Sequence, residues 1–413
     1  MKGEIICVGS EILYGDILYT NTKYLSSRMT DLGVSVYYQS VVGDYEQDLL
    51  DAIELAVGRS VVIILTGGLG PTSDDITKET LSKYFNSELI MDAACKERLE
   101  SFFIGRGYNM TENNYKQALI PSIGSALFNN NGTAPGIYIP YNNKHVAILP
   151  GPPGEMKPMF EEVLVPILKK HIDVIIRSKT LKLIGIGESD AASRIQPIID
   201  AYENPIIAPY AKLSEVHFKI TSKGDSAKVC EALIAQAEIK IRAVLGGYIY
   251  TDTSSDLPET IIGLLKERDF TISLAESCTG GLLSKMLVDV PSVSDVYNEG
   301  FIVYSYEAKV KYLDVSQVTL DEYGAVSEQV AIQMAIGCQK KADSDIAISI
   351  TGIAGPGGGT DEKPVGTVHI GIAHKEERYH YQLNLPGNRE KIRENSAKRA
   401  LTYLYFILIG RPI

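Results

Sequence analysis

Two segments of this sequence join an apolar strand-like run to a glycine-rich turn and the start of a helix. In the first, Val61–Leu65 is followed by Thr66-Gly67-Gly68-Leu69-Gly70-Pro71-Thr72-Ser73-Asp74-Asp75. In the second, Phe270–Leu274 is followed by Ala275-Glu276-Ser277-Cys278-Thr279-Gly280-Gly281. Turns of this kind lie at the carboxyl ends of parallel strands, where α/β folds bind their ligands. The chain is therefore predicted to be an α/β protein with two active sites.

Length and composition narrow the class of protein further. A chain of 413 residues is too long for one ordinary core, so two or three domains are expected. The net charge of −11 argues against direct binding to nucleic acid, which needs clustered Lys and Arg. The five cysteines never form a Cys-x-x-Cys pair, which favours a reducing compartment and gives no zinc pattern. With neither a signal peptide nor a membrane-length apolar run, we expect a cytoplasmic protein with no membrane attachment.

Strand and helix patterns alternate in the first part of the chain, from Glu4 to about Phe85. The order is strand–helix–strand–helix–strand, which predicts a doubly wound sheet. The predicted strands are Ile5–Val8, Val34–Val42 and Val61–Leu65, and the helices are Asn21–Leu32 and a segment from Tyr45. Further expected elements are helices at Ala93–Phe103 and near Thr111, and strands at Ile137–Ile139 and Val146–Leu149. The segment Pro150–Met156 is expected to lead into a helix that ends near Lys170.

The remaining chain divides into a small module and a second α/β region. The module is predicted to have strands Ser178–Leu183 and Glu215–Thr221 and helices Ser189–Tyr202 and Ser226–Val244. Asp252–Asp256 is polar and turn-rich and is interpreted as a linker. Beyond it we expect strands at Ile346–Ile350, Val365–Ala373 and Arg378–Leu385 and a helix from about Asn388. The predicted domains are residues 1–172, 173–254 and 255–413.

Ser277 has two interpretations. A serine at the start of a helix is commonly an N-cap. A serine on a strand-to-helix turn can also be a nucleophile, because adjacent N–H groups and the helix dipole stabilise an oxyanion. Cys278 is a rival nucleophile, since a helix N-terminus lowers the pKa of a thiol.

A serine nucleophile needs a base, and Lys309 is the candidate. It is expected on the first turn of the helix that follows the strand Phe301–Val303. Burial near a helix N-terminus lowers the pKa of a lysine and lets it accept the serine proton. The alternative is an ordinary solvated lysine.

The loop Thr351–Gly359 follows a buried-type strand and contains five glycines. It is interpreted as a binding loop for a phosphate or sugar, with a flexible connection as the alternative. Arg389 and Arg393 lie one helical turn apart and either pair with a phosphate or remain solvated.

In the first domain, Gly67, Gly68 and Gly70 offer backbone donors to phosphate oxygens. Asp74 and Asp75 are expected to open the next helix, either as favourable partners of its dipole or as ligands of Mg²⁺. Further oxygen ligands are sought among the early acidic residues, namely Glu11, Asp16 and Asp44.

Several motifs in sequence order resemble the competence/damage-inducible (CinA) family over nearly the whole chain. The first domain is similar to the molybdopterin-binding (MoaB/MogA-like) fold, and the last third to the PncC-type nicotinamide mononucleotide (NMN) deamidase domain. The middle module resembles the KH-type linker domain of that family. The resemblance implies a doubly wound N-terminal domain, an α+β linker and a three-layer α/β C-terminal domain. The matching segments are Gly9–Leu13, Thr20-Asn21, Gly67–Thr77, Gly132–Gly136, Leu149–Met156, Ala275–Gly281, Gly300–Lys309, Gly324–Ser327 and Gly352–Thr367.

The resemblance implies two hydrolytic activities in pyridine-nucleotide salvage. The C-terminal domain is expected to convert NMN to nicotinic acid mononucleotide and ammonia, with Ser277 as nucleophile and Lys309 as base. The N-terminal domain is expected to cleave ADP-ribose to AMP and ribose 5-phosphate, with a divalent metal, taken as Mg²⁺, at Asp74 and Asp75. A homodimer is also expected.

The resemblance also implies binding residues in each domain. Tyr306 is a departure, because the family often carries Asn there. Alternatives to the bifunctional hydrolase are a molybdopterin-binding protein and a non-catalytic partner in competence or DNA damage. The residues expected to bind NMN are Thr279, Gly280, Gly281, Tyr304, Thr351, Gly352, Gly355, Gly357 and Arg389. Those expected to bind ADP-ribose are Glu11, Asn21, Thr66, Gly67, Gly68, Gly70, Thr72, Gly151 and Pro152.

Overall fold

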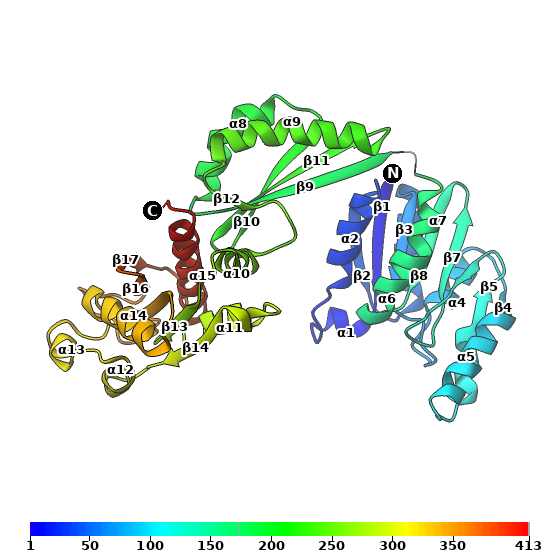
Figure 1. Ribbon diagram of the computed structural model, residues 1–413. Helices are drawn as coiled ribbons and strands as arrows, with labels where there is room; N and C mark the ends of the chain where they lie inside the picture. Colours follow the sequence, from blue (N-terminus) through cyan, green and yellow to red (C-terminus); the bar gives the residue numbers. More distant parts are fainter. Residues whose placement is uncertain (173, 412–413) are drawn as a thin grey trace. The chain divides into compact units, whose positions relative to one another are not determined.

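The computed structural model describes residues 1–172 and 174–411. Its N-terminal part holds a six-stranded sheet in the order β2-β1-β3-β8-β7-β6, which confirms the predicted doubly wound fold (Figure 1). The four strands β2, β1, β3 and β8 run parallel, and β7 and β6 continue the sheet antiparallel. The strands are β1 (Lys2–Val8), β2 (Ser35–Val42), β3 (Val62–Thr66), β6 (Ser125–Leu127), β7 (Gly136–Tyr141) and β8 (Lys144–Leu149).

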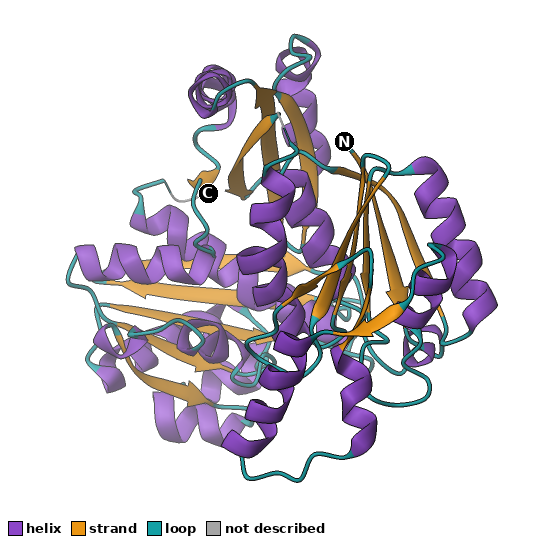
Figure 2. Ribbon diagram, turned by 90° about the vertical axis from the view of Figure 1, so that its right-hand side faces the viewer, coloured by secondary structure: helices purple, strands orange, loops and turns teal. Residues whose placement is uncertain are grey.

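Helices cover both faces of this sheet (Figure 2). One face packs against α2 (Asn21–Asp31), α6 (Pro153–Met159), a π-helical turn (Phe160–Leu164) and α7 (Val165–Lys169). The other packs against α3 (Glu46–Arg59), α4 (Thr77–Tyr84) and α5 (Ala93–Gly105). The central strand β3 is buried at all five positions, because both of its faces are covered. The smaller elements are α1 (Ser10–Leu13), a 3₁₀ helix (Glu112–Ala118), and the paired strands β4 (Leu89–Met91) and β5 (Leu119–Pro121).

The middle module is a four-stranded sheet in the order β10-β11-β9-β12 with two helices. Sequence patterns predicted the two inner strands and both helices but not the edge strands. β10 contains Pro209, which an edge strand tolerates because its outer N–H groups need no partner. β12 is only three residues long. The elements are β9 (Ile175–Ile184), α8 (Glu188–Asp200), β10 (Ile206–Lys212), β11 (Glu215–Gly224), α9 (Ala227–Leu245) and β12 (Ile249–Thr251).

The C-terminal part is a three-layer α/β domain, as expected. Its sheet has the order β14-β13-β15-β16-β17, with β14, β13 and β15 parallel and the last two strands antiparallel. The strands are β13 (Ile272–Glu276), β14 (Tyr297–Ile302), β15 (Ile346–Gly352), β16 (Thr367–His374) and β17 (Glu377–Asn384). One face packs against α10 (Leu257–Glu267), α11 (Leu282–Val288) and α15 (Arg389–Leu408). The other packs against α12 (Tyr306–Leu313), α13 (Gln317–Tyr323) and α14 (Glu328–Ala342).

The chain forms two compact units, residues 1–178 with 221–235 and residues 179–220 with 236–413. The division runs through the middle module, so the three predicted domain boundaries stay a prediction. Within residues 1–172 and 174–411, no helix combines the length and apolarity that crossing a membrane requires.

Two predicted helix starts were wrong. Asp74 and Asp75 lie in the turn before α4, which begins at Thr77, because the Thr77 hydroxyl donates to the Gly67 carbonyl and its N–H to Gly68. The helix after Ser277 begins at Leu282 rather than at Gly280. Gly280 and Gly281 take positive φ angles of +59° and +92°, a left-handed conformation that interrupts the helix.

Candidate active sites

Ser277 lies on the turn between β13 and α11 and is 8% exposed. Its backbone N–H donates to the Ile350 carbonyl at the end of β15, at 2.9 Å. Its side chain makes no cap to α11, whose N-cap is Gly281. The N-cap interpretation of Ser277 was therefore wrong.

The cap of α11 is supplied by Glu276, a role that sequence patterns did not reveal. Its buried carboxylate accepts from the N–H groups of Gly281, Leu283 and Ser284 at 3.0, 3.1 and 2.8 Å. A carboxylate at a helix N-terminus also faces the positive end of the dipole. Glu276 therefore fixes the turn and leaves the adjacent Ser277 hydroxyl free for another partner.

That partner is Lys309. Its Nζ lies 3.2 Å from Ser277 Oγ and donates to the carbonyls of Val303 at 2.8 Å and Tyr304 at 3.1 Å. The side chain is completely buried, no carboxylate of residues 1–172 or 174–411 pairs with it, and desolvation lowers the pKa of Lys309 to about 8. The solvated-lysine interpretation was therefore wrong. A neutral Lys309 amine is accessible near neutral pH and within reach of the Ser277 proton.

Cys278 is a core residue. It is 5% exposed and packs with β13, α11 and α15, and burial raises the pKa of its thiol to about 12. A thiol that stays protonated is a poor nucleophile. The environment therefore favours Ser277 over Cys278.

The N–H groups of the turn are divided between structural and free roles. Those of Gly280 and Gly281 donate to Ser277 O and Glu276, so neither is available to an oxyanion. Within the described chain, the N–H groups of Cys278 and Thr279 have no acceptor. Arg393 of α15 donates to the carbonyls of the same two residues at 3.1 and 2.6 Å and holds their peptide units in place.

The predicted NMN-binding loop is held by the same helix. Arg389 donates to the Gly355 carbonyl at 2.9 Å and contacts the Tyr304 hydroxyl at 3.4 Å, so it ties the loop to the segment that precedes α12. Tyr304 is 62% exposed, and Gly357 has open space around its Cα. Thr351 and Gly352 end β15 instead of belonging to the loop.

Two other side chains near this loop hold backbone groups. The Thr351 hydroxyl donates to the Ala325 carbonyl at 2.8 Å, and the Tyr306 hydroxyl accepts from the Ala325 N–H at 3.1 Å. Tyr306, the departure from the family pattern, therefore still makes a polar contact.

The glycine-rich turn after β3 lines a pocket of about 710 Å³ in the N-terminal domain, the cradle pocket. Gly67 and Gly68 have positive φ, and a Cβ on Gly67 would lie 2.1 Å from Val8 O. Glycine is therefore required for the backbone to line the pocket. The predicted residues that line it are Glu11, Asn21, Asp44, Thr66, Gly67, Gly68, Gly70, Asp74, Asp75, Gly151 and Pro152, whereas Thr72 and Asp16 do not.

Two of these residues shape the pocket wall. Asn21 donates to the Gly151 carbonyl at 2.7 Å and to Thr66 Oγ1 at 3.3 Å, and Thr66 donates to Pro150 O at 3.0 Å. The Asn21 Oδ1 atom is buried without a protein partner, as is Oε1 of Gln117, which also lines the pocket. Two unpartnered acceptors in one pocket are typical of a site that binds donors of a ligand.

The acidic residues only partly fit a metal site. No group of three His, Cys, Asp or Glu side chains able to hold a metal occurs among residues 1–172 and 174–411. Asp75 accepts from the Thr72 N–H at 3.0 Å, and the Thr72 hydroxyl contributes to lowering the pKa of Asp74. Mg²⁺ commonly takes one or two carboxylates together with substrate phosphates. Asp74 and Asp75 beside the glycine turn fit that arrangement.

Lys78 and Lys116, which the sequence did not indicate as site residues, support the backbone of this turn. Lys78 is buried and donates to the Lys116 carbonyl, and burial lowers the pKa of Lys78 to about 8. Lys116 donates to Thr72 O at 2.9 Å and Asp75 O at 2.5 Å. Lys116 is far from the turn in sequence. Lys78 is close to it, but it is a charged residue whose burial no local pattern reveals.

Comparisons with known proteins agree with this arrangement of domains. Three family models match: a probable molybdopterin-binding domain over residues 4–170, the damage-inducible protein CinA KH domain over 178–251, and the CinA C-terminal domain over 254–408. A protein of Caldicellulosiruptor bescii named for competence-damage induction is 48% identical over 98% of both chains. The chain belongs to the CinA family.

Other CinA relatives match either the whole chain or one part of it. A CinA-like protein of Kosmotoga olearia is 47% identical over 98% of both chains. A solved competence/damage inducible protein, CihA from Agrobacterium tumefaciens, is 38% identical and covers 37% of this chain and 92% of its own, with a TM-score of 0.36. In this CinA chain, Ser277 and Lys309 lie in the CinA C-terminal domain and the cradle pocket in the molybdopterin-binding-like domain.

Proposed function

We propose that the C-terminal domain is an amidohydrolase that converts NMN and water to nicotinic acid mononucleotide and ammonia. The observation that carries the proposal is the buried Lys309 amine 3.2 Å from Ser277 Oγ. Serine needs a neighbouring base to act as a nucleophile, and burial lowers the pKa of Lys309, which favours its neutral form.

The reaction follows from these positions. Neutral Lys309 takes the proton of Ser277 as Oγ attacks the carboxamide carbon. The N–H groups of Cys278 and Thr279 stabilise the oxyanion. The C–N bond then breaks as the Lys309 ammonium gives its proton to the departing NH2 group, which leaves as ammonia. Water activated by Lys309 next attacks the Ser277 ester and releases the carboxylate product.

Binding of the mononucleotide is proposed at the loop held by Arg389. Tyr304 offers an exposed ring to the pyridinium, and the open backbone around Gly357 suits the phosphate. The Arg389 and Arg393 guanidiniums, from the first part of α15, add positive charge, although both already donate to carbonyls.

The test is ammonia release from NMN by purified protein. Ser277→Ala should lose activity by more than 10³-fold, since the nucleophile is removed, while Cys278→Ala keeps it within a few-fold. Substrate binding by Ser277→Ala, measured by calorimetry, separates loss of chemistry from loss of folding. Full activity in Ser277→Ala with loss in Cys278→Ala would contradict the assignment.

For the N-terminal domain we propose hydrolysis of ADP-ribose to AMP and ribose 5-phosphate. The cradle pocket supports this, because the glycine turn gives phosphate oxygens backbone donors beside two carboxylates. Asp74 and Asp75 would hold Mg²⁺, which neutralises phosphate charge and activates water. Asn21 and Gln117 would accept hydrogen bonds from substrate hydroxyl or amino groups.

This second activity is tested by product chromatography with ADP-ribose and Mg²⁺. Asp75→Asn should reduce AMP formation by at least 10²-fold. Asp16→Asn is the matched control, since Asp16 lies outside the pocket lining. No AMP from the wild type, together with tight pterin binding, would favour a molybdopterin-binding protein instead.

A further inference from the structure

A second hollow of about 440 Å³ lies beside the cradle pocket, within the same N-terminal unit. We call it the aromatic pocket. It is built by α5 and by the segment that follows β6, and it is lined by Cys95, Glu97, Arg98, Leu99, Ser101, Phe102, Phe128, Asn129, Asn130, Gly132, Thr133 and Pro135. Thr133 also lines the cradle pocket, so the two hollows adjoin at this residue.

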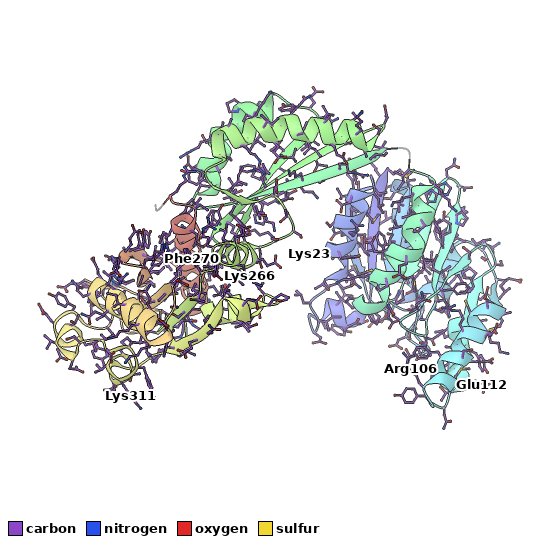
Figure 3. The ribbon with its side chains drawn as sticks, in the orientation of Figure 1. Lys23, Arg106, Glu112, Lys266, Phe270 and Lys311 are labelled. Atoms are coloured by element: carbon purple, nitrogen blue, oxygen red, sulfur yellow. The ribbon has the colours of Figure 1, made fainter. Side chains whose placement is uncertain are left out.

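Phe102, Phe128 and Arg98 line the aromatic pocket, and Arg106 packs on the Phe102 ring. The Arg98 guanidinium lies 4.8 Å from the Phe128 ring centroid, and that of Arg106 lies 3.7 Å from the Phe102 centroid. Arg106, at the end of α5, is labelled in Figure 3. Phe128 is 38% exposed, so a flat ligand can reach its ring. Aromatic faces backed by guanidinium groups are typical of sites that stack nucleic-acid bases.

The rest of the pocket lining is apolar at Cys95 and Leu99 and polar at Asn130. Cys95 and Leu99 form an apolar floor, with 4% and 2% exposure. Asn130 is exposed and accepts from Arg98 at 2.7 Å through Oδ1, so its amide N–H groups are left for another acceptor. An Asn amide can recognise the edge of a base through hydrogen bonds.

The wall between the two hollows is fixed from the cradle side. Asn129 donates to the Ala134 carbonyl at 3.0 Å and to Glu155 at 2.6 Å, and Glu155 itself lines the cradle pocket. The loop Asn129–Pro135 is thus anchored where the pockets meet, and a ligand that passes over Thr133 would occupy both.

We propose that the aromatic pocket binds the adenine of the dinucleotide-like substrate while its phosphates occupy the glycine cradle. This inference rests on the proposed ADP-ribose activity and adds which end of the substrate is recognised. The ribose end, which has no aromatic group, is left to the polar acceptors Asn21 and Gln117. The competing location for the base is the aliphatic wall of the cradle pocket, formed by Ile12, Ile17 and Leu18.

The experiment compares three variants of the full chain by calorimetry with AMP, with ribose 5-phosphate, and by steady-state kinetics with ADP-ribose. Phe128→Ala should weaken AMP binding roughly 5- to 100-fold, the cost of a lost base–aromatic stack. The KM for ADP-ribose should rise by a similar factor, while kcat and binding of ribose 5-phosphate change less than two-fold. Ile104→Ala, on the exposed side of α5, is the matched control and should match the wild type.

The outcomes separate this inference from the proposed activity. AMP binding that depends on Phe128, without hydrolysis of ADP-ribose, would support the aromatic pocket and refute the activity. Hydrolysis with unchanged AMP affinity and KM in Phe128→Ala would refute the pocket. It would also be refuted if wild-type protein bound no AMP at millimolar concentration, or if only Leu18→Ala weakened AMP binding.

Discussion

Lys78 in the N-terminal domain and Lys309 in the C-terminal domain are buried lysines in nearly matched settings. Each lies in the first turn of a helix, each is at most 1% exposed, and burial lowers the pKa of each to about 8. Their partners differ. Lys309 reaches a serine hydroxyl, whereas Lys78 donates to the carbonyl of Lys116.

The difference teaches that a lowered pKa by itself does not mark a base. Lys78 and Lys116 together hold the backbone of Thr72 and Asp75, so their role is to shape the cradle. Lys309 shares its environment with a nucleophile on a turn that has free N–H donors. A catalytic assignment thus depends on what lies within hydrogen-bond distance of the lysine.

The largest difference between the two lysines is expected for Lys309→Met, which keeps roughly the length of the side chain and removes the base. We expect ammonia release from NMN to fall by about 10²- to 10⁴-fold, the usual contribution of general acid–base catalysis. The measurement is kcat with NMN at pH 8. A fall of less than ten-fold would mean that another group takes the Ser277 proton.

The pH dependence of the reaction tests whether Lys309 is the base. Only the neutral amine of Lys309 accepts a proton, so kcat/KM should rise about ten-fold per pH unit below the pKa of about 8 and level off above it. A stopped assay of ammonia from pH 6 to 9.5 measures the profile. A profile that is flat from pH 6.5 upward would exclude Lys309 as the titrating base.

The smallest effect is expected for Lys78→Met, which should leave kcat with NMN unchanged. The substitution is expected to change the pH dependence of the free energy of unfolding. A lysine whose pKa falls from 10.5 unfolded to about 8 folded destabilises the protein below pH 8, and this cost disappears as the pH rises to 10.5. Relative to Lys78→Met, the wild type should therefore gain up to about 3 kcal/mol across that range.

Urea unfolding of both proteins at pH 7, 8, 9 and 10 provides the measurement. The contribution of Lys309 is the same in both proteins and cancels in the difference. An unfolding free-energy difference that stays constant with pH would show that Lys78 is charged in the folded protein, or solvated, at every pH tested.

Local sequence predicted what depends on neighbouring residues. The continuous apolar runs of β3 and β15 and the glycine pairs after β3 and β13 located both sheets and both turns. The edge strand β10 was missed because Pro209 opposes a strand unless the outer edge is free. The glutamate cap of α11, the Lys78–Lys116 contact and the Arg393 contacts depend on tertiary structure, and no periodicity reports them.

The structure also bears on alternatives that the sequence left open. Ser277 does not cap α11, Lys309 is buried and not solvated, and the buried setting of Cys278 favours a protonated thiol. The roles of the NMN- and ADP-ribose-binding residues, the metal and the homodimer stay predictions, since they concern molecules other than this chain.

Arg393 binds the carbonyls of Cys278 and Thr279, which lie 115 and 114 residues before it in the chain. The Lys309–Ser277 contact, by comparison, spans 32 residues. Closing the longer loop costs more chain entropy, and distant contacts generally form late during folding. A refolding chain should thus acquire its sheet and its serine–lysine pair before the oxyanion donors are locked. Recovery of catalysis would then lag behind recovery of secondary structure.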